Sequence, residues 1–131
     1  MREKELRVAL VCYGGISLAV TMHGVTKEIW HATRASRAWR ANDTPPGGVA
    51  GVYMALFDTI GQDRALAMRF VPDILTGASA GGINAVFLAQ ALITGQSLDG
   101  LTRLWLECAD SDELIAPSAP LSEVMVWAID Q

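Results

Sequence analysis

The chain has few of the residues that form disulfides or bind transition metals, with two cysteines and two histidines among 131 residues. No cysteine and histidine set has the spacing of zinc ligands, so we expect no metal and no cofactor. Cys12 and Cys108 are far apart and both lie in apolar runs. We interpret them as buried free thiols, which fits a reducing compartment.

The sequence also lacks an excess of positive charge and any long apolar run. Its net charge is −4 and its pI is near 5.0, whereas domains that bind nucleic acid are usually basic. No apolar run approaches the ~20 residues of a membrane span. The run at residues 8–12 stops at Gly14-Gly15, too early for the core of a signal peptide. We therefore expect no nucleic-acid partner and a cytoplasmic protein whose membrane contact is at most peripheral.

What is present is a pattern of strands and helices in one domain. Residues 6–12 and 70–76 have the apolar character of buried parallel strands, and Pro72 is expected to limit the second ladder at its start. Helices are expected over residues 18–40, 51–60, 79–94, about 101–108 and 122–130. The order is typical of an α/β fold with a parallel sheet, but two strands are few. We expect the domain to be incomplete in this chain.

Turn and capping residues set the expected limits of these helices. Ser17 is the expected N-cap of the first helix, whose apolar residues recur at helical spacing in Leu18, Met22, Val25 and Ile29. Residues 42–48 form a breaker cluster and predict a surface loop. Gly61 is the expected C-cap of the second helix, and Gly95 is expected to end the helix that follows Ser79.

The most informative stretch is Gly77-Ala78-Ser79-Ala80-Gly81, which follows a short apolar run and precedes an apolar segment. This is the pattern of a nucleophile elbow, a sharp turn from strand to helix with a serine at the corner. A strained turn needs neighbours with almost no side chain, and these residues meet that need. The alternative is a small-residue turn in which Ser79 merely caps the helix. The apolar segment favours a helix buried in the middle of a domain.

A second glycine turn, Gly14-Gly15-Ile16, follows the first expected strand. It is the candidate for part of an oxyanion hole, with the backbone N–H groups of Gly14, Gly15, Ile16 and Ala80 as donors. A dinucleotide loop is excluded because its spacing requires glycine where the chain has Ile16. A turn that is tight only for packing remains an alternative.

The general base is the missing element. Both histidines, His23 and His31, precede Ser79, whereas an α/β-hydrolase triad has its histidine last. His23 is more often a core or surface residue than a catalytic one. Asp99-Gly100 is expected in a turn at the far end of the elbow helix, roughly 22 Å away. Asp110 and Asp112 are interpreted as solvated loop acids.

These features together resemble the patatin-like phospholipase family. The resemblance rests on Tyr13-Gly14-Gly15, His23-Gly24-Val25 and the elbow run of residues 77–85, which ends in Asn84-Ala85. It implies a three-layer α/β/α sandwich with a mainly parallel sheet. It also implies a lipid acyl hydrolase, a phospholipase or lipid esterase, that uses a Ser79–aspartate dyad. The aspartate is then expected outside this segment, so residues 1–131 are expected to be the N-terminal portion of a patatin-like domain and inactive alone.

The resemblance is weaker at the first turn. The family usually has a third glycine and then an arginine and glycine there, whereas this chain has residues Ile16 to Ala19. This departure motivates an alternative, a catalytically weak scaffold that keeps the fold and binds lipid or partners. The oligomeric state is not predicted.

Two further groups of residues have alternative interpretations. A basic half of the first helix is read as a solvated face rather than a site for anionic headgroups. Its residues are Lys27, Arg34, Arg37 and Arg40. Four tryptophans are read as core or subunit contacts rather than interfacial anchors. They are Trp30, Trp39, Trp105 and Trp127.

Overall fold

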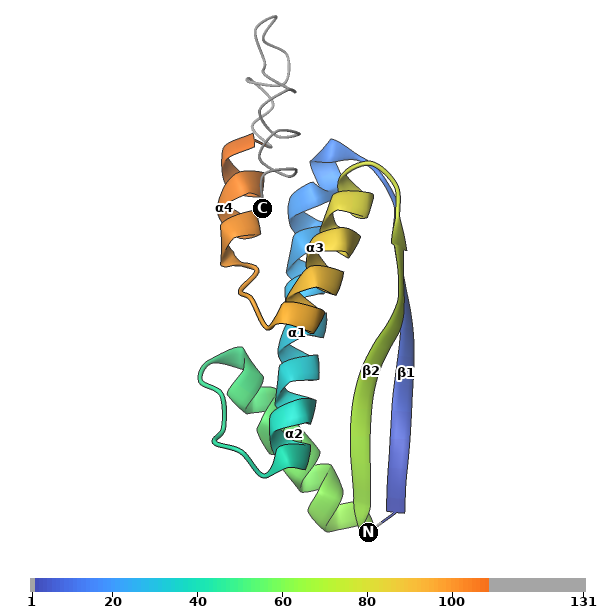
Figure 1. Cartoon of the computed structure of the whole chain (residues 1–131), viewed down its shortest axis with the longest axis vertical. Helices are drawn as coiled ribbons and strands as arrows, with labels where there is room; N and C mark the ends of the chain where they lie inside the picture. The colour runs from blue at the N-terminus through green and yellow to red at the C-terminus, as the bar shows by residue number, and fades with distance from the viewer. Residues whose placement is uncertain (1, 109–131) are drawn as a thin grey trace, which may run out of the picture.

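A computed structural model describes residues 2–108 of the chain. Two long parallel strands, β1 (Arg2–Cys12) and β2 (Leu66–Gly77), form its sheet (Figure 1). Arg2 pairs with Leu66 and Cys12 pairs with Gly77, so both strands finish at the same edge. The mixed α/β class and the parallel pairing expected from the sequence are confirmed, although both strands begin earlier than expected.

Pro72 does not mark the start of β2. It lies in the middle of the strand, at an irregularity where Val8 pairs with Pro72 and Ala9 pairs with Ile74. Asp73 is the extra residue, and its Oδ2 accepts a hydrogen bond of 2.9 Å from Arg7 Nη1. Proline has no N–H to give to a ladder and is tolerated at bulges and sheet edges. The expectation that Pro72 limits the start of the strand was therefore wrong.

Four α-helices accompany the strands in the described residues: α1 (Ala19–Ala41), α2 (Val49–Arg64), α3 (Ala80–Thr94) and α4 (Asp99–Cys108). A short 3-10 helix, η1 (Ile16–Leu18), precedes α1. Ser17 lies inside η1 and Leu18 takes the N-cap position of α1, so the expected cap at Ser17 was wrong. Gly61 is buried within α2, which ends three residues later than Gly61 at Arg64; that expected C-cap was also wrong. Gly95 ends α3 with φ 78°, as expected.

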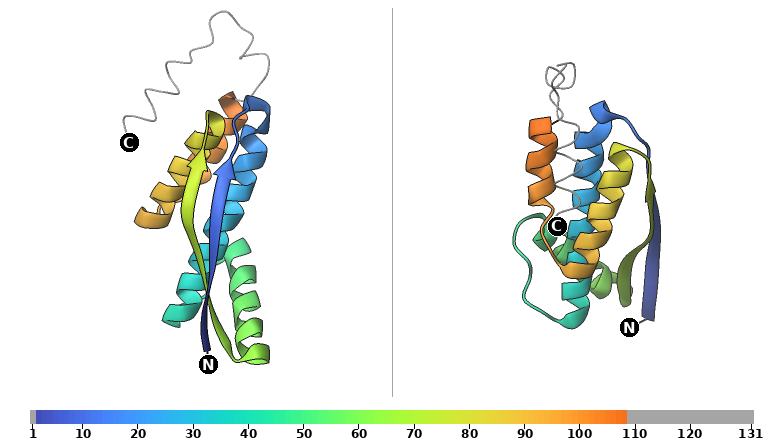
Figure 2. Two further views of the ribbon diagram at one scale, coloured as in Figure 1. Left: turned by 90° about the vertical axis from the view of Figure 1, so that its right-hand side faces the viewer. Right: turned by 45° about the horizontal axis from the view of Figure 1, so that its top comes forward.

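The helices lie on one face of the sheet. In Figure 1, α1 and α3 pack beside the two strands and α4 lies outside them. The left view of Figure 2 looks onto the other face, which no described element covers. Val11 and Ile74 are more than half exposed. The described residues therefore form two layers of the expected three.

The apolar core lies between the sheet and the helices and continues to α4. One buried cluster joins Trp30 of α1 to Leu88 and Leu92 of α3, and a second joins Ala19 and Ala80 to Trp105 of α4. The expected core positions of Trp30 and Trp105 are confirmed. Trp127 and the expected helix over residues 122–130 lie outside the described residues, as do Asp110 and Asp112.

Two helices expose part of the apolar surface that the sequence suggested would be buried. Met22 and Ile29 of α1 pack against the core as expected, whereas Leu18 and Val25 are about half exposed. The buried residues of α1 include His23, Thr26 and Thr33. Each buried threonine satisfies its hydroxyl locally; Thr26 Oγ1 donates to the carbonyl of His23 at 2.8 Å. On α3, Val86 and Ile93 are 66% and 85% exposed. The expectation of a helix buried nearly all round is wrong for the described part of the chain.

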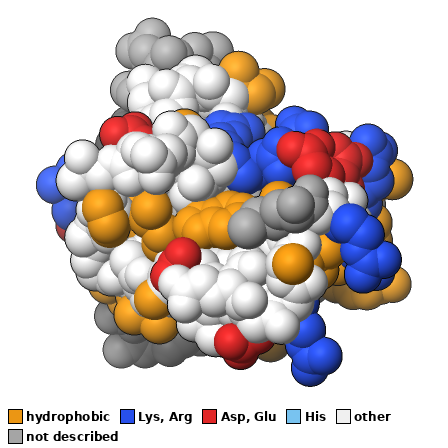
Figure 3. Space-filling view, turned by 90° about the horizontal axis from the view of Figure 1, so that it is seen from below, with side chains coloured by type: hydrophobic (Ala, Val, Ile, Leu, Met, Phe, Trp, Pro, Cys, Tyr) orange, Lys and Arg blue, Asp and Glu red, His pale blue; other side chains and the backbone are white. Residues whose placement is uncertain are grey.

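The end of the molecule opposite the two glycine turns is shown in Figure 3. Apolar side chains gather in its middle, and charged side chains of both signs surround them. A groove of about 700 Å³ lies between the C-terminal half of α1, β2 and the end of α3. Its lining includes Arg37, Phe70 and Leu92 and no residue of the turn around Ser79. None of the helices of the described residues has the length and apolarity to span a bilayer.

Candidate active site

The two glycine turns meet at one edge of the sheet. β1 leads into Tyr13-Gly14-Gly15 and β2 leads into Ala78-Ser79, both at the upper end of Figure 1. The N–H of Ala78 donates to the carbonyl oxygen of Cys12 at 3.1 Å, which joins the start of one turn to the start of the other. The carboxyl ends of parallel strands are where open α/β sheets bind ligands.

Ser79 has a backbone conformation that ordinary helix starts do not need. Its φ of 54° and ψ of −131° lie outside the regions that L-residues favour. Asn42 and Ala65 also have positive φ, but both have the ordinary left-handed conformation at helix C-caps. A conformation such as that of Ser79 costs roughly 1–3 kcal/mol and is typical of functional sites. The strained corner expected of a nucleophile elbow is present.

The hydroxyl of Ser79 does not act as a helix cap. Ser79 occupies the N-cap position of α3, yet its side chain makes no capping hydrogen bond within the described structure. The side chain is exposed. The alternative interpretation, a serine placed there to satisfy the first N–H groups of the helix, is therefore not supported by the geometry.

The small residues around Ser79 allow very close backbone contacts. A Cβ added to Gly81 would lie 2.2 Å from the carbonyl oxygen of Cys12, and one added to Gly77 would lie 2.5 Å from the backbone of Gly81. A Cβ added to Gly14 would lie 3.0 Å from Ser79 Cβ and from the carbonyl oxygen of Ala78. The structure thus brings Gly14 directly against Ser79. The absence of a side chain at Gly77 and Gly81 allows the start of α3 to pack against the ends of the two strands.

Four backbone N–H groups expected for an oxyanion hole flank this corner. They belong to Gly14, Gly15, Ile16 and Ala80, and within residues 2–108 no protein group accepts a hydrogen bond from them. Gly15 has φ 133°, a backbone conformation that residues with a Cβ rarely adopt. Ala80 begins α3, whose N-terminal end carries the positive pole of the helix dipole. These donors and Ser79 come from the two turns that the sequence singled out.

Asp73 and Asp99 are the nearest aspartates before and after Ser79 in the described sequence, and neither takes the place of a general base. Asp73 lies on β2 and forms an ion pair of 2.9 Å with Arg7. Asp99 begins α4, beyond the C-terminal end of α3, whereas Ser79 precedes the N-terminal end of that helix. Asp99 is 2.8 Å from Lys27 Nζ, and this hydrogen bond lowers the pKa of its carboxyl.

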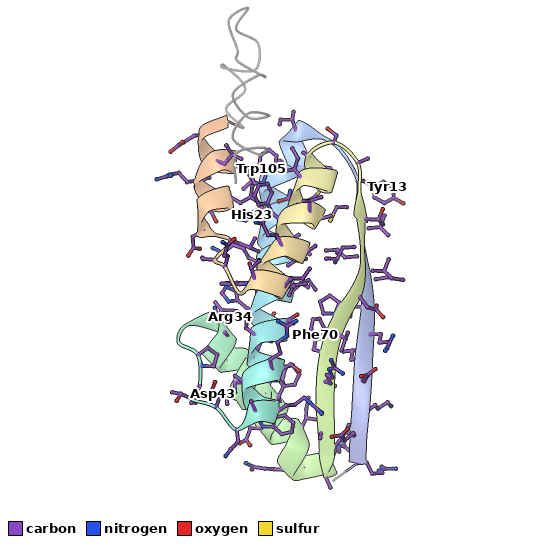
Figure 4. The ribbon with its side chains drawn as sticks, viewed as in Figure 1. Tyr13, His23, Arg34, Asp43, Phe70 and Trp105 are labelled. Carbon is purple, nitrogen blue, oxygen red and sulfur yellow. The ribbon has the colours of Figure 1, made fainter. Side chains whose placement is uncertain are left out.

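His23 lies in the core between α1, α3 and α4 (Figure 4). Its Nε2 is 2.7 Å from Thr102 Oγ1. Burial lowers the pKa of the imidazole, and the positive charge of Lys27 lowers it further. The environment therefore favours a neutral histidine, in agreement with its interpretation as a core residue.

The low pKa of His23 gives a pH dependence of stability. The unfolded imidazole has a pKa near 6.5, so below that pH the unfolded chain binds a proton that the folded chain resists. We expect the midpoint of thermal unfolding to fall as the pH drops from about 7 to about 5. His23→Gln should reduce this slope while keeping a hydrogen-bonding partner for Thr102. An unchanged slope in that variant would contradict the assignment; His31, whose pKa burial also lowers, accounts for a remainder.

Cys12 and three basic residues of α1 are engaged with the chain itself. The thiol of Cys12 is buried and free, and its burial raises its pKa, as expected for an inert cysteine. Arg34 stacks over the Trp30 ring at 4.5 Å, and Arg37 donates to the carbonyl of Leu92 at 2.7 Å. Arg40 pairs with Glu3 at 3.2 Å. Arg34, Arg37 and Arg40 are exposed, as expected for a solvated face, and each also contacts another group of the chain.

One buried polar residue was not recognised as a site residue from the sequence. Asn84 belongs to the elbow run, and its side chain is fully buried and links α3 to α1 and α4. The signal was an amide near the start of a helix whose sequence is mostly apolar, with Gln90 as its second amide. Its partners, Ala19 and Trp105, are 65 and 21 residues away, so no local pattern in the sequence identifies them.

No family model matches the chain, and no solved structure matches it. The chain is 39% identical over 121 residues to a Mycobacterium tuberculosis protein named "uncharacterized membrane protein Rv3479". The match covers 86% of this chain and 11% of that protein. The chain is thus similar to a small part of a much longer protein whose printed name states no activity.

Proposed function

We propose that this chain forms part of a serine acyl hydrolase of the patatin-like type that acts on lipid esters, with Ser79 as nucleophile. The observation that carries the proposal is the conformation of Ser79, φ 54° and ψ −131°, with a hydroxyl that caps nothing in the described structure. A serine that only caps the helix would need neither the strained backbone of Ser79 nor a hydroxyl without a capping hydrogen bond. The fit of Gly14 against Ser79 adds a second, independent feature.

The proposed chemistry is a two-step acyl transfer. Ser79 Oγ attacks the ester carbonyl carbon and gives its proton to an aspartate, while the carbonyl π electrons move onto oxygen. In this proposal the N–H groups of Gly14, Gly15, Ile16 and Ala80 donate hydrogen bonds to that oxyanion. Collapse of the intermediate expels the alcohol, which takes the proton, and leaves an acyl-serine. Water, deprotonated by the same aspartate, then releases the carboxylic acid and restores Ser79.

The proposal places the aspartate, and further strands of a three-layer sandwich, outside residues 1–131. Asp73 and Asp99 are each paired with a cation, and Asp99 lies at the far end of α3. Within residues 2–108 one face of the sheet is uncovered, and neither strand pairs with a third strand. Both features support the proposal that further strands extend this sheet.

An apolar substrate is supported by the side chains around the glycine turn. Tyr13 is 78% exposed, and Ile16 and Leu18 are about half exposed within the described structure. Tyr13 points away from the helices in Figure 4. These side chains flank Gly14 in sequence, and Gly14 lies against Ser79, so we propose that an acyl chain approaches the Ser79 corner along them. Contact with a membrane surface is part of the same proposal.

The test is covalent labelling of the complete protein with a fluorophosphonate probe. The probe should label the wild type and Ser97→Ala, a change of an exposed serine at the start of α4. Ser79→Ala should reduce labelling to background, because the phosphonyl group bonds to the activated serine oxygen. Labelling that persists in Ser79→Ala would exclude Ser79 as the nucleophile.

The second candidate is a scaffold of the same fold that binds lipid without turnover. It is favoured by the replacement of the usual glycine and arginine of the first turn by residues Ile16 to Ala19. Binding to phospholipid vesicles that survives Ser79→Ala, together with no labelling of the wild type, would favour this candidate.

A further inference from the structure

Asn84 is a fully buried amide on the elbow helix, one turn after Ser79. Its Nδ2 donates to the carbonyl oxygens of Ala19 and Ala80, both at 3.2 Å. Its Oδ1 accepts a hydrogen bond of 3.0 Å from Trp105 Nε1. All three partners are buried, and they belong to α1, α3 and α4. A single side chain therefore joins three helices.

The two acceptors are the first residues of the two helices that follow the glycine turns. Ala19 is the first residue of α1, which follows Gly14-Gly15 and η1, and Ala80 is the first residue of α3, directly after Ser79. A bond from one NH2 group to both carbonyls fixes the distance between these helix starts. The proposed oxyanion donors are on both sides of that junction, so their spacing depends on it.

The indole of Trp105 determines which way the amide faces. An indole N–H can only donate, so Oδ1 must face Trp105 and Nδ2 must face the two carbonyls. A flipped amide would leave the Trp105 N–H and both carbonyl contacts without complementary partners. Trp105 is 2% exposed and packs with Ala19, Ala80 and Leu101. Figure 4 shows it between the helices, at the end of the molecule near the turns.

We propose that Asn84 is a positioning residue, which, held in orientation by Trp105, sets the spacing between the Ser79 corner and the Gly14–Ile16 turn. This inference rests on the proposed function for its effect on rate, although its structural part does not. It also gives α4 a role: α4 supplies the donor that orients Asn84. A displacement of about 1 Å between nucleophile and oxyanion donors costs on the order of 100-fold in rate.

If Asn84 had only a structural role, its replacement would change stability alone. The variants must therefore separate an effect on stability from an effect on the spacing between the two turns. Asn84→Leu combined with Trp105→Phe removes the amide and the indole N–H together, so neither side chain is left with an unpaired polar group, which limits the loss of stability. The carbonyls of Ala19 and Ala80 lose the Asn84 donor, and with it the link between the two helix starts. Gln90→Glu is the matched control on α3, since it alters an amide that contacts neither turn. Leu88→Ala is the second control, because it loosens the core at a fully buried position of the same helix.

Two measurements on the complete protein test the inference. The first is fluorophosphonate labelling of Ser79, resolved into a maximal rate and a half-saturating probe concentration. In the double variant the maximal rate should fall about 10- to 100-fold, with the half-saturating concentration changed less than about threefold. The second is hydrogen–deuterium exchange, in which peptides covering residues 13–18 should exchange faster. Both controls should match the wild type in the labelling rate of the folded fraction.

The outcomes separate the two proposals. A wild type that is not labelled at Ser79, with faster exchange in the double variant, would support the positioning role and overturn the proposed function. Wild-type labelling rate and wild-type exchange in the double variant would overturn the positioning role and leave the proposed function standing. An equal loss of rate in Leu88→Ala would also overturn it, because the effect would then follow from stability.

Discussion

Gly81→Ala is expected to destabilise the protein by about 4 kcal/mol or more, one of the largest effects available to a single methyl group. A Cβ at this position would lie 2.2 Å from the carbonyl oxygen of Cys12 and 2.7 Å from that of Tyr13. Both atoms belong to the backbone, which cannot rotate aside as a side chain can. The clash can be relieved only if α3 moves away from the end of β1. That movement would also disrupt the contact between Gly14 and Ser79.

Gly24→Ala is the matched control for that variant. Gly24 lies inside α1, and a Cβ added there meets nothing within 4 Å in the described structure. Alanine loses less conformational freedom than glycine on forming a helix, so this change should stabilise by roughly 0.5–1 kcal/mol. Urea unfolding of both variants measures the comparison. A Gly81→Ala protein as stable as the wild type would show that the turns do not pack as closely as the structure has them.

The corner at Ser79 could be predicted from sequence because its cause is local. A backbone with positive φ and a helix pressed against two strand ends needs small residues at fixed positions, and Gly77, Ala78 and Gly81 are adjacent in the sequence. The helix end at Gly95 was predicted for the same reason, since its left-handed conformation favours glycine. The residues that determine the geometry of such a turn lie within five positions of one another in the sequence.

The buried face of α1 could not be predicted, because its cause is not local. Its apolar residues favoured a stripe through Leu18, Met22, Val25 and Ile29. Met22 and Ile29 do pack against the core, but Leu18 and Val25 are about half exposed, and the helix also buries His23 and Thr26. These polar residues find partners in Thr102 and in their own helix backbone, and α4 is placed over them by packing. The same holds for Asn84, whose role depends on carbonyls and an indole from two other helices.

Pro72 illustrates a third case, in which a correct rule gave a wrong position. Proline does interrupt a strand ladder, but the structure accommodates it with one extra residue, Asp73, in place of an end. An ion pair with Arg7 on β1 holds that extra residue to the neighbouring strand. The sequence shows where the proline lies, but it does not show the shift in strand pairing that accommodates it.

The largest functional effect is expected from Ser79→Ala in a lipid-ester hydrolysis assay on the complete protein. Removal of the nucleophile should lower the turnover rate by at least about 10⁴-fold, because no other group in the proposed site forms an acyl intermediate. The backbone of Ser79 retains its place at the corner in this variant, so its unfolding midpoint should remain within a few degrees of the wild type. Equal hydrolysis by the wild type and the variant would remove Ser79 from the mechanism.

The chain of residues 1–131 provides the complementary measurement, since it carries the nucleophile and the proposed oxyanion donors without the proposed base. Its turnover should be negligible even where its fold is retained, because in the described residues Asp73 is held by Arg7 and Asp99 lies beyond the far end of α3. An unassisted serine hydroxyl is a poor nucleophile at neutral pH, whatever donors surround the carbonyl. Vigorous hydrolysis by this chain alone would place the base within residues 1–131, and the Ser79 corner would then be a complete site rather than half of one.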